Sequence, residues 1–236
     1  MCLAVWRLQD TAVSRPRLTK PLPQIGFLHT AETHVDTFTA LAHARGLSTV
    51  HRVEEAWLAE ASEQGLGNDL TLKVQKALSN LRAECDAVIC TCSTLGTLAE
   101  SLHDPHVFRI DEPMMANAAA IGPQVLLVYC LDSTKETSVE LLTQAFARRP
   151  KATSTSAAVT PLHCQNAWPF FEAAQYKKFG QAIADHILDQ PHTDYSCIVL
   201  AQASMTAALP YMENSVEIPI LSSPASAMDF AQQLLS

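Results

Sequence analysis

A cysteine at the end of an apolar run is the residue of this sequence best suited to chemistry. Cys92 closes the segment AVICTC and is followed by Ser93 and Thr94, two residues that commonly cap helices. Free backbone N–H groups and the positive end of a helix dipole would both favour its thiolate. The alternative is that Cys92 is a small buried hydrophobic residue, as most free cysteines are. The adjoining cap residues favour a functional thiol.

Polar residues follow three further apolar runs. They are His29 and Thr30, then Ser133 and Thr134, and finally the segment Gln202, Ala203 and Ser204. In open α/β sheets, ligands bind beyond the carboxyl ends of the strands, so we expect these clusters to share one site with Cys92. His29 would point toward that cleft, although a solvated loop histidine is an equal alternative.

The other cysteines and histidines do not predict a metal site. Cys85, Cys90 and Cys92 are spaced C-x4-C-x-C, without the second cysteine or histidine pair of a zinc centre. His29 and His34 resemble a zinc-protease pair only superficially, because His29 is expected at a strand end rather than on a helix. The sequence also lacks a Gly-rich phosphate loop and a Gly-x-Ser-x-Gly elbow. We therefore expect neither a metal nor a cofactor.

Short apolar runs alternate with longer helical patterns, which is typical of an α/β fold with a parallel sheet covered by helices. Strands are expected at Gln24–Leu28, Ser48–Val53, Ala87–Thr91, Val107–Ile110, Val125–Cys130, Cys197–Ala201 and Ile220–Leu221. Helices are expected at His34–Ala44, Leu70–Glu84, Thr134–Ala147, Phe170–Leu188, Met205–Glu213 and near Ala225–Leu235, with another starting near Pro113.

Composition and charge narrow the class of protein. The 236 residues are 48% hydrophobic and 17% charged, enough for one large domain or two lobes. A net charge of −8 with only 16 scattered Lys and Arg argues against nucleic acid and anionic membranes as partners. No apolar run approaches the ~18 residues of a membrane span, and the N-terminus lacks a signal-peptide core. We expect a soluble cytoplasmic protein with reduced cysteines, with a homodimer as the default assembly.

Five segments, taken together and in order, resemble the aspartate/glutamate/hydantoin racemase superfamily. They are DAVICTCSTLG (86–96), FRIDEPM (108–114), LDSTKET (131–137), IVLAQASM (198–205) and IPILSSP (218–224). The Cys-Ser-Thr element is similar to that family's Cys-Asn-Thr motif, and IVLAQASM to its Leu-Gly-Cys-Ala-Gly-Met motif. The resemblance covers nearly everything after residue 23.

The resemblance implies two flavodoxin-like (Rossmann-like) lobes with parallel sheets, related by a pseudo-twofold, with the active site in the cleft between them. Residues 23–112 and 214–236 would form the first lobe, residues 113–213 the second, and residues 1–22 a weakly ordered extension. Family members use no cofactor and move a proton at the carbon next to a carboxylate, with one cysteine from each lobe. Met114, in the FRIDEPM segment, joins the candidate substrate contacts.

This chain departs from the family pattern in its second lobe. Cys92 matches the first cysteine, but the second falls on Gln202, which has no proton to exchange near neutral pH. Gln202 can still donate its amide to a carboxylate or a developing enolate. A single thiol favours decarboxylation, isomerisation or lyase chemistry over racemisation, unless Cys164 or His29 reaches the opposite face of the substrate.

We therefore predict an isomerase-like enzyme that acts next to the carboxylate of a small organic or amino acid, with Cys92 as the acid/base. The alternative is a small-acid binding or regulatory protein that kept the cleft and lost turnover. The predicted substrate contacts are His29, Thr30, Ser93, Thr94, Met114, Ser133, Thr134, Gln202, Ala203 and Ser204.

Overall fold

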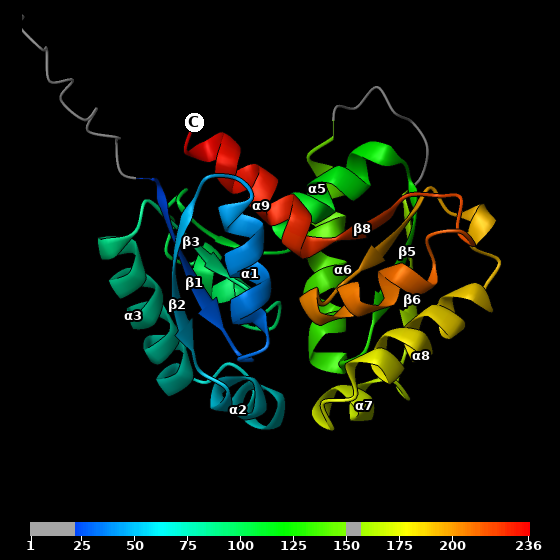
Figure 1. Ribbon diagram of the computed structural model, residues 1–236, viewed down its shortest axis with the longest axis horizontal. Helices are drawn as coiled ribbons and strands as arrows, with labels where there is room; N and C mark the ends of the chain where they lie inside the picture. Colours follow the sequence, from blue (N-terminus) through cyan, green and yellow to red (C-terminus); the bar gives the residue numbers. More distant parts are fainter. Residues whose placement is uncertain (1–21, 150–156) are drawn as a thin grey trace, which may run out of the picture.

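Two four-stranded parallel sheets, each with helices on both faces, form two lobes that lie side by side (Figure 1). This computed structural model describes residues 22–149 and 157–236, so Cys2 and nearly all of the expected N-terminal extension lie outside the described residues. The α/β class and the parallel sheets predicted from the sequence are confirmed. None of the described helices is long and apolar enough to cross a membrane.

The first sheet has the strand order β2-β1-β3-β4. Its strands are β1 (Gln24–His29), β2 (Ser48–Val53), β3 (Ala87–Cys90) and β4 (Val107–Arg109). Its helices are α1 (His34–His43), α2 (Ala56–Gln64), α3 (Asn68–Glu84) and α4 (Gly96–Glu100). The two central strands, β1 and β3, are almost entirely buried because helices cover both faces of the sheet. Helix α2 had no predicted counterpart.

The second sheet has the order β6-β5-β7-β8, which repeats the order of the first. Its strands are β5 (Gln124–Tyr129), β6 (Ala158–His163), β7 (Cys197–Leu200) and β8 (Ile220–Ser222). The helices of this half are α5 (Glu112–Ile121), α6 (Asp132–Ala147), α7 (Trp168–Glu172) and α8 (Tyr176–Leu188), with 3-10 helices η1 (His192–Asp194) and η2 (Ala203–Tyr211). The chain closes with α9 (Ser223–Leu234). Strand β7 therefore holds the place that β3 holds in the first sheet.

Three elements of the second lobe differ from the sequence prediction. Strand β6 was not predicted because it is half-exposed and contains Pro161, which an edge strand tolerates. The helix expected over residues 170–188 is two helices, separated by Ala174 in the left-handed conformation with φ 55°. The helix expected from Met205 is a 3-10 helix with Pro210 inside it.

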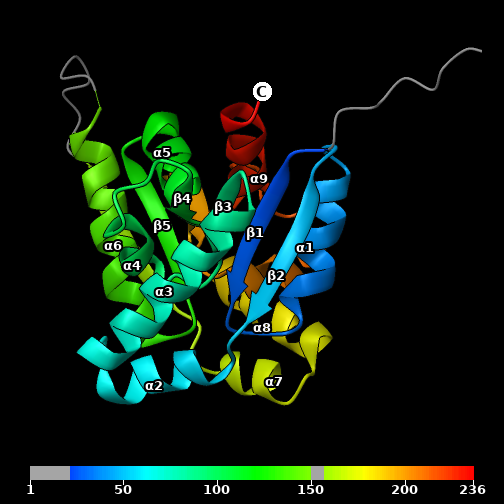
Figure 2. The ribbon, with the colours of Figure 1, turned by 90° about the vertical axis from the view of Figure 1, so that its left-hand side faces the viewer.

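Two helices cross from the sheet that precedes them to the other sheet. Helix α5 follows β4, yet its Met114 and Met115 pack in the core of the second sheet. Helix α9 follows β8, yet its Ala227 and Met228 pack against the first sheet beside Phe27. The two helices also contact each other (Figure 2). This exchange ties the two lobes together.

The sequence assigned residues 214–236 as a block to the first lobe. Strand β8, within that block, pairs in parallel with β7, so Ile220–Ser222 belong to the second sheet. The assignment failed there because the strand and the helix after it pack against different lobes.

Candidate active site

A small cavity of ≈ 50 Å³ lies where the carboxyl ends of the central strands of the two lobes meet. Both lobes contribute to its wall, which consists of Thr30, Ala31, His34, Leu58, Thr91, Cys92, Ser93, Thr94, Leu131, Thr134, Trp168, Phe171, Gln202, Ala203 and Ser204. A space of this size holds only a few water molecules. Most of the side chains that the sequence grouped at four strand ends thus line one cavity.

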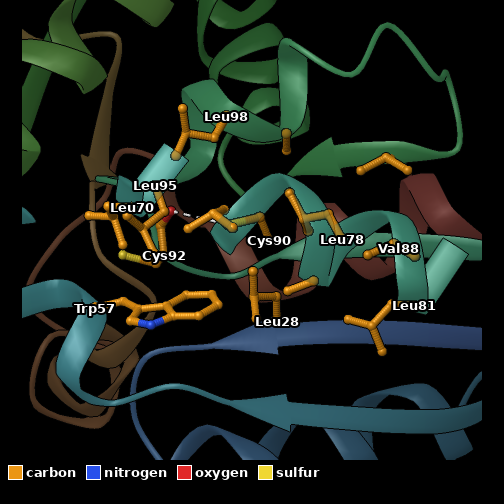
Figure 3. Packing of buried hydrophobic residues seen from close by; sticks show 14 of the residues in the cluster. Leu28, Trp57, Leu70, Leu78, Leu81, Val88, Cys90, Cys92, Leu95 and Leu98 are labelled. Carbon is orange, nitrogen blue, oxygen red and sulfur yellow. Dashed lines mark hydrogen bonds between the residues drawn. The ribbon is translucent and has the colours of Figure 1, made fainter. Parts of the chain in front are cut away.

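Cys92 lies at the cleft end of the first-lobe core, close to Leu95 and Trp57 (Figure 3). The hydroxyls of Thr30 and Thr94 and the backbone N–H groups of Thr94 and Leu95 lie where they would stabilise its thiolate. These four donors favour the thiolate, but burial acts more strongly and raises the pKa of the thiol above its ordinary value. At neutral pH Cys92 therefore carries its proton.

The thiolate expected from a helix N-terminus is thus not supported in this form of the protein. Helix α4 begins only at Gly96 and spans five residues, so its dipole is small and does not start at the sulfur. The donors around Cys92 come instead from the loop between β3 and α4 and from Thr30 at the end of β1.

The loop that carries Cys92 is fixed from two sides. Toward the second lobe, the Ser93 hydroxyl donates to the carbonyl of Ala201 at 3.1 Å, and the hydroxyl oxygens of Thr94 and Ser133 lie 3.4 Å apart, within hydrogen-bonding distance. Behind the loop, Arg109 forms a buried two-bond ion pair with Asp111 at 2.6 and 2.9 Å. The hydroxyl of Ser93 is therefore committed to joining the lobes rather than free for a ligand.

The backbone at Gly96 approaches this arginine closely. A Cβ at Gly96 would lie 3.0 Å from the Arg109 side chain, closer than ordinary packing allows. A residue without a side chain is therefore needed where the loop crosses the ion pair.

Gln202 takes the place in the second lobe that Cys92 takes in the first. Leu28 pairs with Cys90 between β1 and β3, and Val128 pairs with Leu200 between β5 and β7, so each functional residue lies two positions beyond an equivalent pair. The Gln202 Oε1 accepts a hydrogen bond of 2.7 Å from the backbone N–H of Cys130. That bond fixes the amide, and its Nε2 has no hydrogen-bond partner within residues 22–149 and 157–236. Gln202 therefore offers an N–H donor to the cavity that it lines.

His29 is placed differently from the prediction: it is fully buried and does not line the cavity. Its Nδ1 lies 2.8 Å from the hydroxyl of Thr91, and its Nε2 lies 2.8 Å from Nδ1 of His51. The His51 Nε2 in turn lies 2.9 Å from the hydroxyl of Thr39. This chain of contacts anchors Thr91, the residue before Cys92, rather than a substrate.

The direction of each bond in that chain follows from Thr91. Its hydroxyl donates to the carbonyl of Leu28 at 3.0 Å, so it accepts from His29 Nδ1–H. His29 Nε2 must then accept from His51 Nδ1–H, and His51 Nε2 from Thr39. Both imidazoles are neutral in this arrangement, and burial, with nearby His34 and His51, lowers the pKa of His29 to about 3.

Other predicted residues fall outside the cavity wall. Met114 is fully buried in the core of the second sheet, because α5 turns that face away from the cleft. Ser133 meets the site only through Thr94. Cys164 is buried in the opposite core of the second lobe, and burial raises its pKa to about 12. Neither Cys164 nor His29 therefore stands across the cavity from Cys92 as a second acid or base.

Seven residues that line the cavity were not among the predicted site residues: Ala31, His34, Leu58, Thr91, Leu131, Trp168 and Phe171. His34 begins α1, and burial lowers its pKa to about 4, so it is neutral at physiological pH. Leu58 comes from α2, and Trp168 and Phe171 come from α7. The aromatic cluster WPFF (168–171) was the available signal for two of them. Within the described part of the chain, no group of three His, Cys, Asp or Glu side chains is arranged to hold a metal ion.

Solved structures with the same two-lobed architecture cover about nine-tenths of this chain. Allantoin racemase from Pseudomonas fluorescens aligns with a TM-score of 0.58 and 19% identity over 90% of each chain. Glutamate racemase from Francisella tularensis, in complex with D-glutamate, aligns with a TM-score of 0.63 and 11% identity over 92% of this chain and 82% of its own. The chain therefore shares the two-lobed fold of these racemases.

A variant of arylmalonate decarboxylase has the same fold, with a TM-score of 0.59 and 14% identity over 90% of this chain and 93% of its own. No protein-family model matches the sequence, and no curated protein sequence matches it. The fold is therefore shared across racemases and a decarboxylase.

Proposed function

We propose that this protein is a cofactor-independent enzyme that transfers a proton at the carbon next to a carboxylate, with Cys92 as its acid/base. The observation that carries the proposal is the pairing of Cys92 and Gln202 on the wall of one cavity, at equivalent strand ends of the two lobes. The thiol supplies or accepts the proton, and the amide supplies a hydrogen bond without a proton to transfer.

The carboxylate would bind at the second-lobe side of the cavity. The N–H groups of Thr134 and Lys135 at the start of α6 bond back to Leu131, which leaves for an anion the backbone amides of Asp132 and Ser133, between the lining residues Leu131 and Thr134. The Gln202 amide would add a hydrogen bond, strongest when negative charge develops on the enolate oxygens. No metal is required for such a site.

The protonated resting state of Cys92 favours one direction of the chemistry. A neutral thiol is ready to donate its proton to a carbanion or enolate formed on loss of carbon dioxide, and it leaves a thiolate that four donors stabilise. Proton abstraction would first require the thiol to lose its proton to solvent. Decarboxylation followed by protonation, or proton exchange on one face of the substrate, is therefore favoured over racemisation. Racemisation needs a second acid/base on the opposite face of the substrate.

The test follows proton exchange and carbon dioxide release in D₂O, by NMR and chiral chromatography, with a panel of α-substituted carboxylates and malonates. The Cys92→Ser variant should lose about 10²- to 10⁴-fold in rate, the usual contribution of a positioned acid/base. The Cys164→Ser variant is the matched control, because that thiol is buried outside the cavity. Undiminished turnover by Cys92→Ser would rule out the thiol mechanism. Saturable binding without turnover by the unmodified protein would instead support the non-catalytic binding alternative.

A further inference from the structure

The wall of the cavity combines polar and apolar residues and carries no full charge. Gln202, Thr94 and Thr134 contribute polar groups, and Leu58, Trp168 and Phe171 contribute apolar surface. Among the described residues that line the cavity, none is Asp, Glu, Lys or Arg. His34, the one titratable nitrogen base of the wall, is neutral at physiological pH because burial lowers its pKa to about 4.

We infer that the substrate is a carboxylic acid whose α-carbon carries an uncharged apolar or aromatic group, and not a zwitterionic amino acid. This inference rests on the proposed function and names the substrate class of that same site. An α-ammonium group placed in this cavity would be buried without a carboxylate partner, which is strongly unfavourable. One carboxylate, by contrast, has helix and amide donors without needing a cation.

The apolar part of the wall comes from the short aromatic helix α7 of the second lobe and from Leu58 of the first lobe. Trp168 and Phe171 of α7 stack with ring centroids 4.7 Å apart, and both remain partly exposed. The Trp168 Nε1–H donates to Glu172 at 3.0 Å on the same helix, so the polar edge of the indole is already satisfied. The remaining indole surface suits an aromatic or branched group better than a charged one.

The cavity of ≈ 50 Å³ is smaller than such an acid, so we expect its walls, which include residues of α2 and α7, to move apart when the acid binds. Both helices lie at the same end of the molecule, one from each lobe (Figure 1). The aromatic side chains of α7 also pack against Phe179 of α8, which keeps the short helix attached to the second lobe. The substituent on the substrate would then take the space next to Trp168 that opens between the two helices.

The sharpest test uses two ligands of nearly the same shape. 2-Phenylpropionate and phenylglycine differ in a methyl group against an ammonium group on the α-carbon. Calorimetric titration of the full chain should show 2-phenylpropionate binding at least about 10-fold more tightly, with glutamate weaker than both. The Trp168→Ala variant should lose about 10-fold for 2-phenylpropionate and little for propionate. The Phe170→Ala variant is the control, because Phe170 lies on α7 but not on the cavity wall.

A charge placed in the wall should reverse the preference. The Leu58→Glu variant adds a carboxylate on the partly exposed α2 side of the cavity and should bring phenylglycine to at least equal affinity. Tighter binding of phenylglycine or glutamate by the unmodified protein would overturn the inference and leave the proposed chemistry standing. The expected preference without any exchange in D₂O would uphold the inference and overturn the proposed function.

Discussion

The two lobes have the same strand order but differ in the chemistry at equivalent strand ends. After β3, the first lobe places the thiol of Cys92 with four hydrogen-bond donors around it. After β7, the second lobe places Gln202, whose amide is anchored by the backbone N–H of Cys130. One lobe can therefore exchange a proton and the other can only hold a negative charge. The cleft therefore has a proton-transfer group on the first-lobe side only, although the two sheets have the same strand order.

The lobes also differ behind these ends. The first lobe buries the Arg109–Asp111 ion pair after β4 and the neutral His29–His51 chain beside β1. The end of β8, which corresponds to β4, leads instead to Ser223, whose buried hydroxyl has no partner among the described residues. The lobe that carries the thiol therefore has more buried polar side chains with hydrogen-bond or ion-pair partners near its strand ends.

The strongest way to break the asymmetry is to give the second lobe a thiol. Gln202→Cys should create interconversion of enantiomers of 2-phenylpropionate, at a rate about 10²-fold or more above the unmodified protein, because a second proton-transfer group would face Cys92. Chiral chromatography with deuterium wash-in measures it. Gln202→Ala removes the same amide without adding a thiol and should not racemise. Failure of the cysteine variant to racemise a ligand that it still binds would contradict the placement of residue 202 opposite Cys92.

The buried polar groups after β4 and β8 should respond in opposite ways to truncation. Asp111→Ala removes the buried partner of the Arg109 guanidinium, leaving only the half-exposed Glu100 at 3.5 Å, and should lower the free energy of unfolding by about 3–5 kcal/mol. Ser223→Ala removes a hydroxyl that has no partner among the described residues, so it should be neutral or stabilise by up to about 1 kcal/mol. Urea denaturation of both variants measures the difference, and equal losses would refute it.

The histidine chain should make the first lobe sensitive to acid. Burial lowers the pKa of His29 to about 3, so the unfolded chain takes up a proton below pH ~6.5 while the folded protein does not. Stability should therefore fall as the pH falls from about 6.5 toward 3, by up to about 1.4 kcal/mol per pH unit for this one histidine.

Denaturation midpoints between pH 7 and pH 5 provide the measurement. The His29→Gln variant should show a shallower dependence of stability on pH than the unmodified protein. Tyr129→Phe, the matched change at the equivalent end of β5, should leave that dependence unaltered. Parallel pH profiles for the unmodified protein and His29→Gln would show that His29 does not resist protonation.

Much of the fold and part of the site were predictable because they depend on local pattern. Uniformly apolar runs such as those around Val88 and Val199 indicate strands buried on both faces, and both are fully buried. The polar residues just beyond such runs gather at one edge of parallel sheets, and this rule predicted that Cys92 and Gln202 lie in one site. Strand β6 was not predicted because an exposed edge strand has no uniformly apolar run.

The three-dimensional packing alone decided the protonation of Cys92, the burial of His29 and the crossing of α5 and α9. Each of these features depends on which distant segment of the chain packs over a residue. Hydrophobic periodicity predicts that a residue is buried but not which segment buries it. The helix-start pattern near Cys92 suggested a thiolate, but burial by both lobes raises the pKa of the thiol. Likewise, the sequence showed the aromatic residues of α7, and only the meeting of α7 with α2 placed them over a cavity without charge.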